Sequence, residues 1–74
     1  MSYWQRLKFA RKMRGLTLRG AARALNISPA TLVYYENGAH KVNYEMMEKI
    51  CKLYDVPIAY IAGEKAAAEV FKEV

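Results

Sequence analysis

The hydrophobic and polar positions of the chain repeat with the period of an α-helix, and no stretch alternates in the manner of a β-strand. The pattern predicts five short helices, over residues 3–13, 18–25, 28–36, 43–54 and 58–62. The last segment predicts a sixth, amphipathic helix over 64–74, with an apolar stripe of Ala67, Val70, Phe71 and Val74. We therefore expect an all-α chain of five helices followed by a short C-terminal helix.

The boundaries of these helices coincide with residues suited to begin or end a helix. The starts are predicted by side chains that cap free N–H groups, namely Thr17, Ser28 followed by Pro29, and Asn43. The ends are predicted by residues that favour other backbone angles, namely Gly15, Asn37-Gly38, Asp55-Val56-Pro57 and Gly63. In the fourth helix the apolar side is expected to consist of Tyr44, Met47, Ile50, Cys51 and Tyr54.

The second and third helices are short and separated by a tight break. Ala22 is small, so the two helices can cross at close range, and Asn26 tolerates the left-handed backbone that the break needs. This arrangement is typical of a helix-turn-helix.

The ordered set of residues resembles the Cro and phage-repressor type of helix-turn-helix DNA-binding domain, also called the Xre family. The resemblance rests on Arg11, Gly15-Leu16-Thr17, Ala21-Ala22, Leu25-Asn26-Ile27-Ser28, Leu32, Glu36-Asn37-Gly38 and Tyr54-Asp55-Val56-Pro57. It covers about residues 6–63. It implies a five-helix DNA-binding domain over 1–63, followed by a C-terminal tail over 64–74 that serves dimerisation or packing.

Two residues make the resemblance more specific. Members of this family commonly pair an arginine near the end of the first helix with a glutamate near the end of the third. Arg11 and Glu36 occupy these positions, so the resemblance implies a structural ion pair between them.

The resemblance also implies that the third helix enters the major groove of DNA. The residues expected to face the bases are Ser28, Pro29, Ala30, Thr31, Val33 and Tyr34. None of them is Arg, Lys, Asn or Gln, the side chains that read bases through paired hydrogen bonds. What remains are hydroxyl contacts and apolar contacts with thymine methyl groups. Two alternatives stay open: specificity depends on DNA shape and phosphate contacts, or the helix meets a protein in place of DNA.

Positive charge is concentrated in the first part of the chain. The sequence holds 12 Lys+Arg and 7 Asp+Glu, a formal net charge of +5, and Glu36 is the single acid among the first 41 residues. Such a distribution favours binding to a polyanion, because contacts with phosphates release counterions. The expected phosphate contacts are Arg14, Thr17, Arg19, Arg23, Asn37, Gly38, Lys41, Asn43 and Tyr44, while Arg6, Lys8 and Lys12 are expected to lie farther away.

A module of this size reads few base pairs, so the resemblance implies a homodimer on a palindromic site. The expected dimer surface consists of Ile58, Tyr60, Ile61, Ala67, Val70, Phe71 and Val74. The alternative is that the tail folds back on the core of its own chain.

Other classes of function find no support in the sequence. The single cysteine, Cys51, cannot form an internal disulfide, and together with the single histidine, His40, it is too little for a tetrahedral metal site. No nucleophile lies beside a base, and no glycine-rich phosphate loop occurs, so we expect neither an enzyme nor a cofactor or metal. No run of 18 apolar residues and no apolar N-terminal run occurs, so we expect a cytoplasmic protein without a membrane partner.

The sequence thus predicts a small, sequence-specific DNA-binding transcription regulator of the kind found in phages and mobile elements. It is expected to act as a repressor-like dimer that reads the major groove with helix 28–36. Its expected partners are double-stranded DNA, a second copy of itself and a regulatory protein. The alternative is a protein-binding module, an anti-repressor or antitoxin-like subunit that uses the same fold and its apolar third helix.

Overall fold

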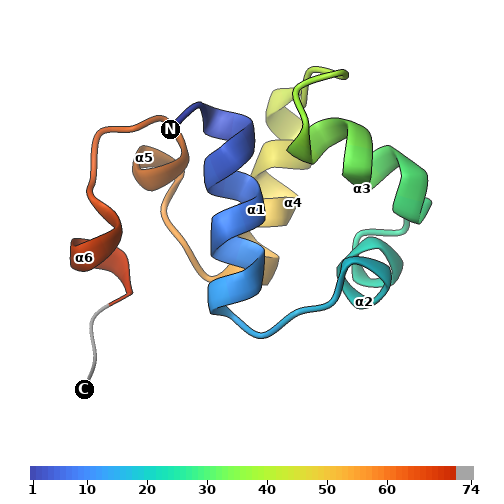
Figure 1. Ribbon diagram of the computed structural model, residues 1–74, viewed down its shortest axis with the longest axis horizontal. Coiled ribbons are helices and arrows are strands. Elements are labelled where there is room, and N and C mark those ends of the chain that lie inside the picture. The colour runs from blue at the N-terminus through green and yellow to red at the C-terminus, as the bar shows by residue number, and fades with distance from the viewer. Residues whose placement is uncertain (72–74) are drawn as a thin grey trace.

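The computed structural model describes residues 1–71, and within that range it contains helices and no strands. The helices follow one another as α1 (Tyr3–Met13), α2 (Leu18–Ala24), α3 (Pro29–Glu36), α4 (Tyr44–Tyr54), α5 (Ile58–Ile61) and α6 (Ala67–Val70). Figure 1 shows α2 and α3 at one end of the long axis, α5 and α6 at the other, and α1 and α4 between them. The all-α fold expected from the hydrophobic pattern is confirmed.

The predicted helix starts are confirmed by side-chain caps. The hydroxyl oxygen of Thr17 accepts a hydrogen bond from the N–H of Gly20 at 3.0 Å, and that of Ser28 accepts one from Thr31 at 3.1 Å. Asn43 Oδ1 accepts a hydrogen bond from the N–H of Met46 at 2.8 Å. Each bond satisfies an N–H group that the first turn of a helix leaves without a partner.

The turn between α2 and α3 has the expected geometry. Asn26 has a φ of 58°, which lies in the left-handed region, and the N–H of Ile27 donates a hydrogen bond to the carbonyl of Ala22 at 3.0 Å. Ala22 itself is 1% exposed, so its methyl group fills the space where the two helices meet. These features fix the position of α3 relative to α2.

One core collects apolar residues from α1 to α5. The fully buried side chains of greatest volume are Tyr54, Tyr60, Leu7, Leu32, Ile50 and Ile61. One expected member is wrong: Tyr44 was predicted on the apolar side of α4, but it is 68% exposed. It is the first residue of the helix, directly after the cap, and its side chain lies outside the part of α4 that reaches the core.

The C-terminal tail folds back on its own chain. The ring of Phe71 packs edge-on against Phe9, with 5.8 Å between the centroids, and against Tyr60 at 5.5 Å. A helix over 64–74 was predicted, and within the described residues α6 spans Ala67–Val70. Val74 lies outside the described residues.

Candidate nucleic-acid interface

A buried ion pair joins the end of α1 to the end of α3. Arg11 Nε donates to Glu36 Oε2 at 2.7 Å, and Arg11 Nη2 donates to Glu36 Oε1 at 3.1 Å. A third donor, Arg11 Nη1, bonds the carbonyl of Leu16 at 2.9 Å. The hydrogen bond with Glu36 raises the pKa of Arg11 above its ordinary value. This pair is present where the family resemblance implied it, and it fixes α3 against α1.

The same ion pair determines the charge of the surface around α3. Glu36 is the single acid among the first 41 residues, and it is 8% exposed and bound to Arg11. Consequently, none of these residues presents a carboxylate on the surface, although eight of them carry positive charge. The surface of this part of the molecule therefore suits a polyanion.

The solvent-facing side of α3 is uncharged. Val33 is 40% exposed and Tyr34 is 44% exposed, while Pro29 and Ala30 are exposed at the start of the helix. Thr31 is half-buried, and Leu32 and Glu36 face the interior. Five of the six residues expected to face the bases, Ser28 included, are thus on the surface, and the sixth is partly covered.

The ring of Tyr34 lies against the loop that follows α3. Its centroid is 4.7 Å from that of His40, and the N–H of His40 donates a hydrogen bond to the carbonyl of Tyr34 at 3.2 Å. The loop therefore holds the aromatic ring at the end of the exposed face of α3.

The indole ring of Trp4 packs against Gly38 of this loop, a contact that was not predicted from the sequence. Gly38 has a φ of +81°, and a Cβ atom there would lie 2.8 Å from Trp4 Cε2. The loop therefore needs glycine both for its backbone angle and for its contact with the indole ring. Inside the loop, Asn37 Oδ1 accepts a hydrogen bond from the N–H of Ala39 at 2.9 Å.

The basic side chains near α3 differ in part from those expected. Arg19 and Arg23 are exposed on α2, and Lys41 is exposed in the loop after α3. Lys8 was expected to lie farther away, but it lines a hollow together with Val33 of α3. The helical repeat from Arg11 back to Lys8, three residues apart, is the signal in the sequence that places both on one side of α1.

Arg14 is exposed, and part of its guanidinium is engaged within the protein. It was expected to contact phosphate, but its Nε donates to the carbonyl of Tyr54 and its Nη2 to the carbonyl of Asp55, both at 2.7 Å. Its guanidinium also lies over the ring of Phe71, 4.8 Å from the centroid. The carbonyls at the end of α4 carry partial negative charge, which explains why this arginine binds there.

The expected dimer surface also requires a correction. Tyr60 is 1% exposed and Ile61 is 2% exposed, so both side chains belong to the core of their own chain. Ile58 lies half-buried in a hollow lined also by Tyr3, Met47 and other residues. Ala67, Val70 and Phe71 are half-buried against the core, as the alternative interpretation of the tail predicted.

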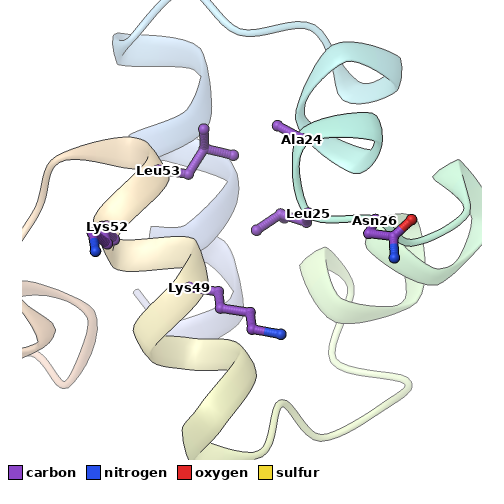
Figure 2. Close-up of a pocket in the computed structure, with 6 residues that line it drawn as sticks. All are labelled: Ala24, Leu25, Asn26, Lys49, Lys52 and Leu53. Carbon is purple, nitrogen blue, oxygen red and sulfur yellow. The ribbon is translucent and has the colours of Figure 1, made fainter.

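A separate hollow lies between the end of α2 and α4. Figure 2 shows its two sides, with one formed by Ala24, Leu25 and Asn26 and the other by Lys49, Lys52 and Leu53. No residue of α3 lines it, so it is distinct from the surface expected to meet the bases.

The described residues offer little other chemistry. Among residues 1–71 no cluster of His, Cys, Asp and Glu side chains is arranged to hold a metal ion. Burial raises the pKa of the Cys51 thiol to about 11, so the thiol is protonated at neutral pH. None of the described helices is long and apolar enough to span a membrane.

The chain is similar in sequence and structure to known helix-turn-helix proteins. The sequence model of a helix-turn-helix family matches residues 7–61. The antitoxin PezA of Streptococcus pneumoniae serotype 4 is 38% identical over 58 residues, which make up 78% of this chain and 37% of that protein. The chain therefore spans little more than a third of this curated relative.

Two crystal structures of the clp gene regulator ClgR from Corynebacterium glutamicum are also similar, each at 29% identity. The first has a TM-score of 0.79, and the match covers 84% of this chain and 66% of the other. The second has a TM-score of 0.76, with 88% of this chain and 90% of the other covered.

Proposed function

Because this chain belongs to the Cro and repressor type of helix-turn-helix family, we propose that it is a sequence-specific DNA-binding transcription regulator that acts in the manner of a repressor. In this proposal α3 lies in the major groove, and basic side chains and helix starts around it bind phosphates. The base-facing residues are Ser28, Pro29, Ala30, Thr31, Val33 and Tyr34.

The observation that carries the proposal is the distribution of charge around α3. The exposed face of α3 is neutral, Lys8 and Arg19 are exposed on the helices beside it, and Glu36 is buried by its pairing with Arg11. A neutral helix surrounded by positive charge suits the groove of a duplex, whose bases lie between two rows of phosphates.

The phosphate contacts proposed for this surface are of two kinds. Positively charged side chains supply the first kind, namely Lys8, Arg19, Arg23 and Lys41. Free N–H groups at helix starts and in the loop supply the second kind, around Thr17, Ser28, Asn37, Gly38, Asn43 and Tyr44. Arg14 is left out, since its donors bind the end of α4.

We further propose that the chain binds DNA as a homodimer, since two copies double the number of base pairs that are read. The surface for a second copy is limited to residues with exposed area. Ile58, Ala67 and Val70 meet this condition, whereas Tyr60 and Ile61 are buried.

Gel shifts at two salt concentrations test this function, with random duplexes and with a duplex selected from random DNA by the full chain. The wild-type protein should bind at low salt, and its affinity should fall steeply as salt rises. Arg19→Ala should weaken binding to all sequences alike, whereas Lys65→Ala, which removes an exposed charge of the tail, should leave binding unchanged. Tyr34→Ala should weaken binding in a sequence-dependent way.

The second candidate is a protein-binding module, favoured by the similarity to an antitoxin and by the apolar surface of α3. In this case α3 meets an apolar groove of another protein. A folded dimer that binds no DNA at low salt would favour this candidate over the first.

A further inference from the structure

The exposed face of α3 lacks the side chains that read base edges through paired hydrogen bonds. Between Ser28 and Glu36 the helix carries Pro29, Ala30, Thr31, Leu32, Val33, Tyr34 and Tyr35. Guanine and adenine are recognised in the major groove mainly by Arg, Lys, Asn and Gln, and cytosine by Asp and Glu. If α3 meets DNA, its specificity must come from a different feature of the bases or from the shape of the duplex.

Hydroxyl groups at the start of α3 are largely occupied within the protein. Ser28 Oγ accepts a hydrogen bond from the N–H of Thr31 at 3.1 Å, and the two hydroxyl oxygens are 2.9 Å apart and share a hydrogen bond. One of the two hydroxyl protons is used in this bond, and Thr31 is half-buried. Because these hydroxyl groups already bond within the cap, Ser28 and Thr31 have few hydrogen bonds left for contacts with bases.

Apart from the hydroxyl of Tyr34, the groups that remain on this face are apolar. Ala30 and Val33 are three residues apart and lie on the same side of the helix, next to the ring of Tyr34. Leu18 of α2 lines the same hollow as Val33, so the apolar surface continues onto the neighbouring helix. In the major groove, the apolar group that a base presents is the methyl group on C5 of a pyrimidine.

The charges around this apolar surface indicate whether DNA or a protein binds to it. Lys8 lines the hollow beside Val33, and Arg19 is exposed one residue after Leu18. An apolar surface beside these positive charges fits the methyl groups of duplex DNA, which lie between phosphates, better than an uncharged protein segment.

We propose that α3 selects its DNA site through the C5-methyl groups of pyrimidines, with Val33 and Ala30 as the contacting residues. This inference rests on the proposed function and deepens it. Thymine and 5-methylcytosine both carry this methyl group and are the two bases that would be favoured.

The test uses a duplex selected from random DNA by the full chain, in which each thymine in turn is replaced by deoxyuridine. This replacement removes the methyl group and keeps the hydrogen-bonding pattern of the base. Fluorescence anisotropy should show an affinity loss of about fourfold for each methyl group that is contacted. A second pair of duplexes, with cytosine or 5-methylcytosine at the sensitive position, shows whether the methyl group is recognised on either base or on thymine alone.

Variants of the contacting residues separate direct contact from effects of DNA shape. Val33→Ala and Ala30→Ser change exposed positions, and circular dichroism melts verify that they fold. In at least one of them the ratio of thymine to uracil affinity should fall from about fourfold towards one at a single position. Arg19→Ala is the matched control, because it should weaken binding to both duplexes and leave their ratio unchanged.

Equal affinity for thymine and uracil duplexes at every position would overturn the inference and leave the proposed function intact. A ratio that persists in both contact variants would also overturn it, since the methyl groups would then act through the stiffness of the duplex. If the folded protein binds no duplex at low salt, the proposed function itself fails.

Discussion

Arg11 and Glu36 are bound to each other by two hydrogen bonds across 25 positions of sequence, and both side chains are nearly inaccessible to solvent. The pair therefore does two things at once. It fixes the end of α3 against α1, and it removes the single carboxylate among the first 41 residues from the surface that is proposed to meet DNA. Packing and surface charge thus depend on the same contact.

Replacement of Glu36 by alanine should lower the free energy of unfolding by about 3–5 kcal/mol, because Arg11 would remain buried without its partner. Urea melts of Glu36→Ala measure this loss, and Glu45→Ala, which removes an exposed acid at the start of α4, is the control. A loss below about 1 kcal/mol would contradict the view that the pair is buried and well formed.

Gly38→Ala should destabilise the protein more than Gly15→Ala does. Both glycines have positive φ, +81° and +72°, so alanine is strained by about 1–2 kcal/mol at either position. At Gly38 the new methyl group would also meet the Trp4 ring, which should add about 1–3 kcal/mol, whereas nothing lies within 4 Å at Gly15. Thermal melts compare the two variants, and a shift of Trp4 fluorescence should accompany only the first. Equal losses would show that the indole ring moves aside freely.

Much of the fold was predictable, because the signals that define it are local. The caps at Thr17, Ser28 and Asn43 and the left-handed Asn26 depend on neighbours within a few residues, and all of them are found as expected. The resemblance to a family supplied the partner of Arg11, which no local pattern would have given.

The sequence gives least information where a side chain depends on segments that are distant in sequence. The sequence does not show that the end of α4 lies beside Arg14 and accepts its hydrogen bonds. Nor does it show that the ring of Phe71 packs against Tyr60. Trp4 and Gly38 are 34 positions apart, so their contact has no periodic signal. The sequence alone shows which residues can bind DNA or a partner, but the tertiary structure decides which of them are already engaged.

Arg14→Ala and Arg19→Ala should change different properties: the first should change stability, and the second should change the salt dependence of DNA binding. Loss of the two hydrogen bonds from Arg14 to the end of α4 should reduce stability by roughly 1.5 kcal/mol and leave the salt dependence of DNA binding unchanged. Arg19→Ala should change stability by less than about 0.5 kcal/mol and flatten the salt slope by about one unit. Denaturant melts and a titration at several salt concentrations measure both quantities. A flatter slope for Arg14→Ala would return this residue to the phosphate contacts.

Stability should fall in alkali because of Cys51. Burial raises the pKa of its thiol to about 11, whereas an exposed thiol titrates near 8.5, so the folded state holds the proton more tightly. The protonated thiol contributes fully to the free energy of unfolding below about pH 8.5. This contribution is lost as the pH rises towards 11, at up to about 1.4 kcal/mol per pH unit. Urea melts from pH 7 to 10.5 should show a steeper decline for the wild type than for Cys51→Ala. Parallel curves would mean that the thiol is accessible to solvent in the folded state.

Phe71→Ala should weaken the fold and leave the oligomeric state unchanged. Its ring packs against Phe9 and Tyr60 of the same chain and lies under the guanidinium of Arg14, so its loss should cost roughly 2 kcal/mol, about half the figure for a fully buried phenylalanine. Ala68→Ser, an exposed change in the same short helix, should alter neither property. Melts and sedimentation velocity should be measured on the same samples. If Phe71→Ala kept full stability and sedimented as a smaller species than the wild type, the tail would have its partner in a second copy of the chain.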